Sequence, residues 1–276
     1  MLIKEHWNVC SGGIVSKFRV LDLFAGIGGF SLGLERTGGF ETVAFCEIDS
    51  TCQKVLRKNF PNALMFNDVT NLKGSGHTIY NGLGTTKVYE PVDVITGGFP
   101  CQDISVAGKG EGLEGKRSGL WFEYKRLINE IKPKYAIIEN VGNLRSKGLA
   151  TVLKDLREIG YDAEWHILPA RAFGAVHLRE RIFIIAHTND IRLWGPSTTE
   201  EEKQEWWTEA TASQRAVLQQ ARTFEPRIRR SDDGFPARLD RPRRERIKQL
   251  GNAIVPQIAE FIGQRILDYE TNKKRT

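Results

Sequence analysis

Between residues 18 and 187, short apolar runs alternate with segments of helical periodicity. The apolar runs are bounded by turn residues, which is typical of buried strands. Strands that alternate with helices predict a doubly wound α/β fold, in which helices cover both faces of a mostly parallel sheet. The predicted strands are 18–24, 42–48, 63–66, 92–98, 135–140, 163–170 and 181–187, and the predicted helices are 29–37, 50–60, 118–132 and 148–160.

Outside this pattern the chain changes character. Residues 73–90 are rich in glycine and threonine and predict a loop, while the polar segment from about 190 predicts a small inserted lobe. The last segment is again an amphipathic helix, which needs an apolar partner. We therefore expect a main domain at 1–189, a lobe at 190–247, and a C-terminal helix within 248–276 that returns to the main domain.

The totals exclude several classes of protein. The chain has 276 residues, 40% of them hydrophobic, which is enough for a sizeable core. It has no apolar run of about 18 residues and no signal-peptide pattern, so we expect no membrane span and a cytoplasmic protein. The four cysteines form no CxxC pair, which predicts free thiols and no metal site.

Positive charge is concentrated in one place. The net charge is +6, and residues 222–248 hold nine arginines and one lysine against five acidic residues. A solvated charged face is one interpretation. Phosphate contact is the other, because the planar fork of arginine suits phosphate oxygens.

A glycine turn follows the first predicted strand. Gly26, Gly28 and Gly29 allow close approach of the backbone to a ligand, although a tight structural turn would use the same residues. Ser31 occupies the last glycine position of the GxGxxG pattern, which argues against a dinucleotide site. Glu47, 21 residues after Gly26, can accept hydrogen bonds from both hydroxyls of a ribose, and Asp68 can accept one from an adenine amino group. A nucleoside without a pyrophosphate is implied, and S-adenosylmethionine fits this description.

The stretch "GGFPCQDIS" places Cys101 directly after a proline. The cysteine is either incidental to a loop or a nucleophile presented on a bent backbone. For Cys10, Cys46 and Cys52 we expect inert thiols.

The motifs occur in a characteristic order. "DLFAGIGGFSLGLE", "CEID", "ND", "GGFPCQDIS", "ENV", "RERIF" and "QLGNAIVP" follow one another along the chain. This series resembles that of the C5-cytosine DNA methyltransferases, from about residue 18 to 265 apart from the lobe and the Gly-rich loop. The resemblance implies transfer of a methyl group from S-adenosylmethionine to carbon 5 of a cytosine that has been flipped out of duplex DNA.

The resemblance also implies roles for individual residues. Cys101 would add to carbon 6 of the cytosine. Glu139 would contact N3 and the 4-amino group, which requires a raised pKa. Arg181 would contact O2 and Arg179 would support the catalytic loop. His177 stands where the family has glutamine, which leaves the detail of that contact open.

Further residues are implied by their positions in the motifs. The implied cofactor-binding residues are Phe24, Gly26, Gly28, Gly29, Glu47, Ile48, Asp68, Val69, Pro100, Leu120, Asn252 and Ala253. The implied DNA contacts are Gln102, Arg117, Arg227, Arg229 and Arg230. We expect double-stranded DNA as the partner and a monomer in a bacterial or phage-encoded setting, close to the nucleoid, with a cognate restriction endonuclease as a candidate functional partner.

Three rivals share some of these features. An RNA methyltransferase of the same fold would carry an extra Cys-Phe-Thr motif in the lobe, which this chain does not show. A DNA-binding protein built on an inactive methylase would have lost at least one of Cys101, Glu139 and Arg181. A dinucleotide oxidoreductase is disfavoured by Ser31.

Overall fold

The fold is taken from a computed structural model of the chain. It describes residues 17–81, 90–100, 119–175, 179–188 and 253–273, together with the short strands β1 (Val9–Cys10) and β2 (Gly13–Ile14). Cys101, Gln102, Arg117, the predicted lobe at 190–247 and Asn252 lie outside the described residues.

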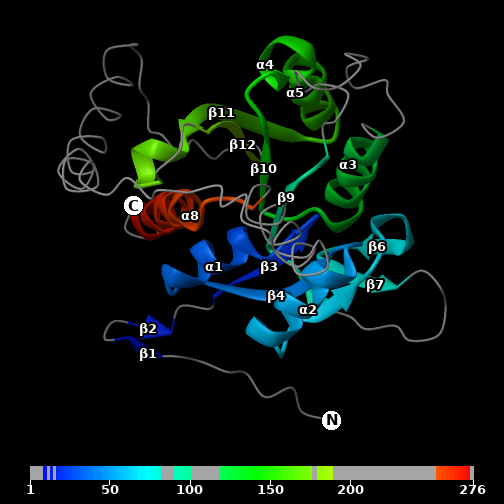
Figure 1. The fold of residues 1–276 in the computed structure, drawn as a ribbon, viewed down its shortest axis with the longest axis vertical. Helices are drawn as coiled ribbons and strands as arrows, with labels where there is room; N and C mark the ends of the chain where they lie inside the picture. Colours follow the sequence, from blue (N-terminus) through cyan, green and yellow to red (C-terminus); the bar gives the residue numbers. More distant parts are fainter. Residues whose placement is uncertain are drawn as a thin grey trace, which may run out of the picture.

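A seven-stranded sheet forms the centre of the molecule (Figure 1). All seven predicted strands are present, and the sheet order is β11-β12-β10-β9-β3-β4-β5. The strands are β3 (Phe18–Leu23), β4 (Phe40–Cys46), β5 (Leu64–Phe66), β9 (Val94–Gly98), β10 (Tyr135–Val141), β11 (Tyr161–Pro169) and β12 (Glu180–Thr188).

Five neighbouring strands, from β10 to β5, run parallel, while β12 is antiparallel to both β10 and β11. The mostly parallel sheet that the sequence predicted is therefore confirmed. In the β10–β12 register, Val141 pairs with Arg181 and Tyr135 pairs with His187. The start of β12 thus lies at the edge where the parallel strands end, which is where α/β sheets bind their ligands.

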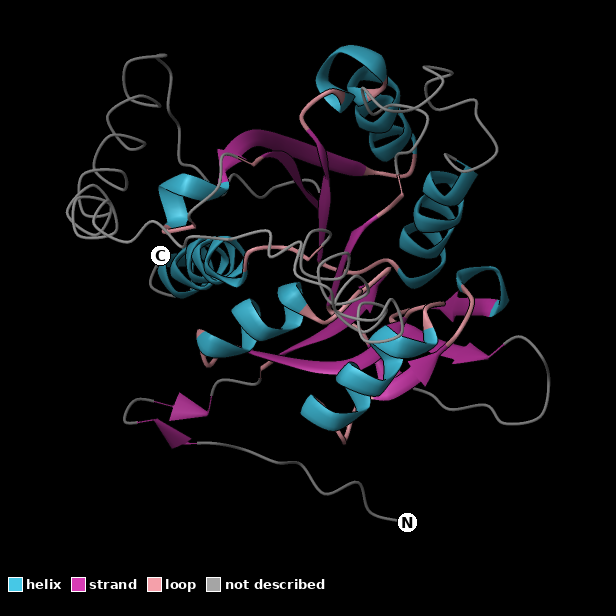
Figure 2. Cartoon of the chain, viewed as in Figure 1, coloured by secondary structure: helices cyan, strands magenta, loops and turns pink. Residues whose placement is uncertain are grey.

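Helices cover both faces of the sheet (Figure 2). On one face, α3 (Gly119–Ile131) and α5 (Leu149–Glu158) share a core with Leu21 and Ile138. On the other, α1 (Gly29–Arg36) and α8 (Pro256–Lys273) pack with Val20 and Ile137. Adjacent strand residues thus face opposite layers, as the two-residue period of a strand requires. The sheet is doubly wound, and α2 (Ser50–Asn59) and α4 (Leu144–Lys147) complete the helices described.

The C-terminal helix α8 packs against α1 and the main sheet. Gly33 of α1 allows α8 to approach closely, because a Cβ on Gly33 would lie 2.1 Å from the carbonyl oxygen of Pro256. Ile258, Ala259, Ile262 and Ile266 of α8 are buried against this face of the sheet.

The prediction of a loop at residues 73–90 is wrong for residues 73–81 and for Glu90, while residues 82–89 lie outside the described residues. This part of the chain contributes to a three-stranded sheet of β6 (Leu72–Ser75), β7 (Thr78–Asn81) and β8 (Glu90–Pro91). Gly76 and His77 link β6 to β7 with positive φ angles of 45° and 66°, as a two-residue hairpin turn requires. Gly74 serves close packing, since a Cβ there would lie 2.3 Å from Ile131 Cγ1.

No helix in the described part of the chain combines the length and apolar character needed to cross a membrane.

Candidate active site

A cavity of about 530 Å³ opens at the edge where the parallel strands end. Its size falls within the usual range for small-molecule sites. Residues of β4, β9, β10, β12, α2 and α3 and of the segments that follow β3 and β5 contribute to its wall. The predicted site residues on this wall are Phe24, Gly26, Glu47, Ile48, Asp68, Val69, Pro100, Leu120, Glu139, Arg179, Arg181 and Ala253.

The glycine turn after β3 bends through several left-handed residues. Phe24, Gly26 and Gly28 have φ angles of 52°, 56° and 86°. Such a conformation is costly for a bulky residue such as Phe24, about 1–3 kcal/mol, and marks functional sites. Gly28 and Gly29 shape the turn without lining the cavity. A Cβ on Gly29 would lie 2.5 Å from the carbonyl oxygen of Ile254, so the segment before α8 packs directly on the turn.

Ser31, which departs from the dinucleotide pattern, has a structural role that glycine could not fill. Its hydroxyl donates a 2.9 Å hydrogen bond to Asp22, and Thr96 donates a 2.8 Å bond to the same carboxyl group. Asp22 is fully buried, and this burial raises its pKa to about 7. The serine ties α1 to the centre of the sheet beneath the glycine turn.

Glu47 connects two segments of the cavity wall. Its Oε2 accepts a 2.7 Å hydrogen bond from the backbone N–H of Gly26, and its Oε1 accepts a 2.8 Å bond from that of Asp49. Gln53 of α2 donates a 2.6 Å bond to the Glu47 carbonyl oxygen. The carboxylate therefore has a fixed orientation toward the glycine turn.

The neighbouring wall combines polar and apolar groups. Asp68 precedes the turn η1 (Val69–Asn71), and its Oδ1 accepts hydrogen bonds from the backbone N–H and hydroxyl of Thr70. Ile48 is 79% exposed, which is unusual for a large apolar side chain and suits contact with a flat apolar ligand. Carboxylates for hydroxyl or amino groups beside an apolar surface fit a nucleoside.

Glu139, on β10, is the buried carboxyl group of the other wall. It is 9% exposed, and burial raises its pKa above the ordinary value although the charges of Arg181 and Arg179 oppose the shift. Arg181 Nε lies 2.9 Å from Glu139 Oε1, yet among the described residues this oxygen has no partner with hydrogen-bond geometry. Gly98 is required beside it, because a Cβ there would lie 2.6 Å from Glu139 Oε2.

The two arginines reach the cavity because β12 is antiparallel. Arg179 Nη1 donates a 2.9 Å hydrogen bond to the carbonyl oxygen of Ala253, which joins this wall to the segment before α8. Burial lowers the pKa of Arg179, and the nearby positive charge of Arg181 adds to that effect. Within the described part of the chain, the buried Nε of Arg179 has no hydrogen-bond partner. Two cations and a carboxyl group therefore share a confined space with donors and acceptors still available.

Asn140 holds the backbone just before the predicted nucleophile. Its Nδ2 donates a 3.1 Å hydrogen bond to the carbonyl oxygen of Phe99, and its Oδ1 accepts a 2.8 Å bond from the backbone N–H of Val141. Asn140 therefore ties β10 to the segment that follows β9. Pro100, the residue before Cys101, lines the cavity.

Seven predicted site residues have no described position. Cys101, Gln102, Arg117, Arg227, Arg229, Arg230 and Asn252 lie outside the described residues. Conversely, sequence reasoning missed Cys46, Cys52, Asn67 and Ile254 as parts of the wall. The motifs "CEID" and "ND" contain the first and third of these, so proximity to a motif was the available signal. Burial raises the pKa of the Cys46 thiol to about 12, in agreement with the inert thiol expected there.

A second cavity, of about 430 Å³, lies among α1, the turn η3 (Ala170–Phe173) and α8. It contains none of the predicted site residues.

Comparison with known proteins agrees with this fold. The profile of the C-5 cytosine-specific DNA methylase family matches residues 18–233. The fold is thus that of a methyltransferase, and the chain belongs to the C-5 cytosine-specific DNA methylase family.

Relatives from several sources also match the chain. The type II methyltransferase M.CviJI of Paramecium bursaria Chlorella virus IL3A is 41% identical over 63% of this chain and 44% of its own length. M.Eco47II of Escherichia coli is 38% identical over 69% of this chain and 44% of its own length. The chain therefore spans about half the length of the curated relatives that it matches.

A solved structure, of a candidate DNA modification methyltransferase encoded within an E. coli prophage, also matches. It has a TM-score of 0.50 and 26% identity, over 67% of this chain and 52% of its own.

Proposed function

We propose that this chain is a DNA (cytosine-5-)-methyltransferase that uses S-adenosylmethionine and acts on a flipped-out cytosine in a specific duplex sequence. One observation carries the proposal: a single cavity contains both the nucleoside-type residues Glu47 and Asp68 and the cluster of Glu139, Arg179 and Arg181. A cofactor and a base held at opposite walls would meet beside Pro100.

The cofactor side fits the proposed ligand. Glu47 and Asp68 supply acceptors for ribose hydroxyls and an adenine amino group, and the exposed Ile48 supplies an apolar surface. S-adenosylmethionine would supply an electrophilic methyl group. The chain's own residues hold and orient it, and the closely packed glycine turn limits the space for water.

The base side explains how carbon 5 becomes nucleophilic. The Cys101 thiolate forms a bond to carbon 6, and the electron pair of the 5,6 double bond moves toward N3 and O2 and makes carbon 5 reactive. Glu139, whose pKa is raised by burial, can keep a proton for N3. Arg181 can donate to O2. After carbon 5 has gained the methyl group, loss of its proton and rupture of the sulfur–carbon bond restore the aromatic ring.

Covalent trapping tests the mechanism. A mixed-sequence duplex containing 5-fluorocytosine should become attached to the protein in the presence of S-adenosylmethionine, because fluorine cannot leave as a proton does. Denaturing electrophoresis would show the adduct. The Cys101→Ser variant should form no adduct and lose methyl transfer by at least about 10³-fold, with cofactor affinity within a few-fold of wild type.

The matched control is Cys52→Ser, because Cys52 is another thiol on the cavity wall. This variant should still form the adduct. Parallel loss of cofactor binding and methyl transfer in Cys101→Ser would mean that Cys101 is structural. Bisulfite sequencing of a host genome that expresses the protein would report the modified base and its sequence context, and transfer RNA offered in parallel should remain unmethylated.

A further inference from the structure

The small sheet β6–β7–β8 belongs to none of the motifs, yet it is fixed to the helix that borders the cavity. Glu130 of α3 accepts a 2.8 Å hydrogen bond from the backbone N–H of Gly74, and its own carbonyl oxygen accepts a 3.1 Å bond from Gly76. The backbone N–H of His77 donates a 2.6 Å hydrogen bond to the carbonyl oxygen of Ile131. The hairpin is therefore held against the end of α3.

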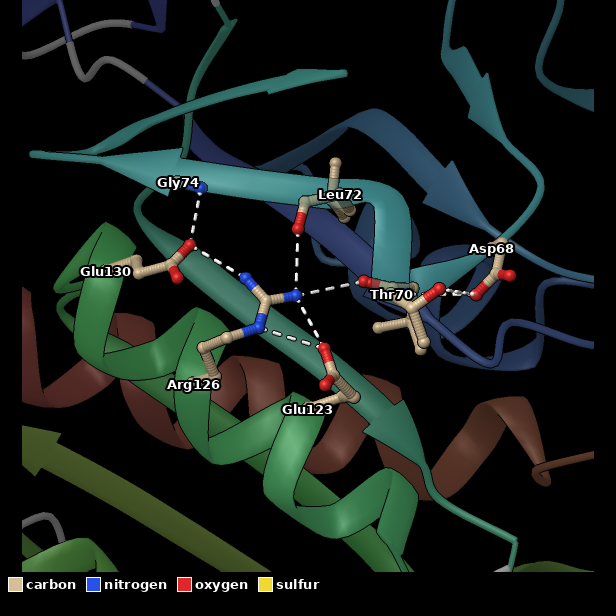
Figure 3. Close-up of polar contacts among 8 residues, drawn as sticks. Asp68, Thr70, Leu72, Gly74, Glu123, Arg126 and Glu130 are labelled. Carbon is tan, nitrogen blue, oxygen red and sulfur yellow. Dashed lines mark hydrogen bonds and ion pairs between the residues drawn. The ribbon is translucent and has the colours of Figure 1, made fainter. Parts of the chain in front are cut away.

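Arg126 lies at the centre of this attachment (Figure 3). Its Nε and Nη2 donate to Oε2 of Glu123 at 2.9 and 2.7 Å, and its Nη1 donates to Oε2 of Glu130 at 2.9 Å. Its Nη2 also donates to the carbonyl oxygens of Val69 and Leu72, at 3.1 and 2.9 Å. The guanidinium group thus joins α3 to Val69, the first residue of η1, and to Leu72, which directly follows η1.

The turn held by Arg126 is the one that presents Asp68. Thr70, within η1, donates from its backbone N–H and its hydroxyl to Asp68 Oδ1, at 2.9 and 2.8 Å. Asp68 and Val69 both line the cavity. A continuous series of hydrogen bonds therefore runs from Arg126 through η1 to the Asp68 carboxylate (Figure 3).

We propose that Arg126 is a positioning residue for the cofactor: it fixes η1 so that Asp68 and Val69 keep the geometry that binds the adenosyl group. The inference rests on the proposed function. The same helix carries Leu120 on the cavity wall, so α3 sets the spacing between two parts of the cofactor site. Lysine cannot replace the arginine fully, because an ammonium group lacks the planar fork that reaches two carbonyl oxygens and two carboxylates together.

Calorimetric titration with S-adenosylmethionine tests the inference. Arg126→Met should weaken binding roughly 10-fold, the size expected for loss of charged hydrogen bonds behind a binding group. Arg126→Lys should recover part of the affinity. The KM for DNA and the rate at saturating cofactor should change little, because the base side of the cavity does not contact Arg126.

Lys125→Met is the matched control on the same helix. Lys125 makes ion pairs to Asp155 and Glu158 of α5, at 2.6 and 3.0 Å, and does not line the cavity. Its removal should lower the melting temperature but leave cofactor affinity unchanged. The contrast between the two variants separates positioning of the cofactor site from general loss of stability.

A double-mutant cycle with Asp68→Ala shows whether Arg126 acts through the turn. If it does, the variant with both Arg126→Met and Asp68→Ala should bind S-adenosylmethionine only slightly more weakly than whichever single variant binds it less well. The effects of Lys125→Met and Asp68→Ala on this affinity should instead be additive. Hydrogen exchange without cofactor should become faster around residues 69–72 in Arg126→Met, a readout that does not depend on ligand binding.

Failure of the inference can be told apart from failure of the function. A wild-type chain that binds S-adenosylmethionine, together with unchanged affinity in Arg126→Met or full additivity with Asp68→Ala, overturns the inference alone. A wild-type chain that does not bind S-adenosylmethionine overturns the proposed function and the inference with it. If Arg126→Met does not fold, Arg126→Lys with the same cycle decides the question.

Discussion

The two walls of the cavity differ in how completely their polar groups are paired. On the proposed cofactor side, both Glu47 oxygens accept backbone N–H bonds, and Asp68 Oδ1 accepts two bonds from Thr70. On the base side, within the described residues, Glu139 Oε1 and Arg179 Nε are buried without a hydrogen-bond partner. Buried polar groups without partners are costly, and in native proteins they mark places where a ligand or a reaction uses them.

This difference indicates which wall should control binding affinity and which should control the rate of reaction. The cofactor wall has its geometry fixed by its own backbone, so it should act mainly through binding affinity. The proposed base wall holds a carboxyl group of raised pKa that is ion-paired with Arg181, and a buried nitrogen, Arg179 Nε, that has no hydrogen-bond partner among the described residues, so it should act mainly through rate. Substitutions on the two walls should therefore separate into two kinetic classes.

The largest effect is expected on the base wall. Glu139→Gln keeps the size of the side chain but removes the titratable proton, so the turnover rate should fall by about 10²–10⁴-fold. Cofactor affinity, measured by calorimetry, should stay close to that of wild type. Equal losses of affinity and rate would abolish the distinction between the walls.

The pH dependence of activity provides a second test of the role of Glu139. Because the pKa of Glu139 is raised, the folded enzyme keeps this proton above the ordinary range for a carboxyl group, and activity should fall as pH rises through the raised pKa. Glu139→Gln should lack that alkaline limb in a profile of kcat against pH. Gly98→Ala places a Cβ against Glu139 Oε2. This variant should have a lower rate and should keep the alkaline limb of the wild type, displaced along the pH axis.

A smaller effect is expected on the cofactor wall. Glu47→Gln directs an amide group toward a backbone N–H that needs an acceptor, and cofactor affinity should fall about 10- to 100-fold. The rate at saturating cofactor should change little, because the loss falls on ground-state binding. The control is Glu41→Gln, an exposed residue of the strand that Glu47 follows, which should have no effect in the same titration.

The smallest functional effect is expected beneath both walls, at Asp22. Its folded-state pKa of about 7 lies above the ordinary value of 3.8, so the folded protein keeps a proton that the unfolded chain releases. Stability should therefore fall as pH rises through this window, by on the order of 1 kcal/mol per pH unit. Denaturant unfolding across pH should show this slope in wild type and its loss in Asp22→Asn. An identical slope in both proteins would contradict the assignment.

Sequence reasoning succeeded where local pattern and local structure agree. All seven strands of the main sheet and the four helices between them were predictable from apolar runs and helical spacing. The positions of Phe24, Glu47 and Asp68 on the cavity wall were predictable because each lies within two residues of the end of a parallel strand. The error at residues 73–90 arose because glycine has two uses: Gly74 allows close packing on Ile131, which no local pattern distinguishes from a loop.

Other features depend on contacts between distant segments. Nothing near Arg126 in the sequence indicates that it bonds to Val69 and Leu72, which lie more than 50 positions earlier. The same holds for Arg179 and Ala253, which are 74 positions apart. The resemblance supplied the importance of Arg179, and only the structure shows which backbone it holds.

The reversed direction of β12 has a consequence for how such a protein can change its specificity. The strand begins at the cavity with Arg181 and ends at Thr188, roughly 20 Å away at the opposite edge of the sheet. The chain next enters the described structure at Ala253, back on the cavity wall. Thr188 and Ala253 are thus both held by the described fold, so exchange of the sequence between these two positions should leave Arg179 and Arg181 in place.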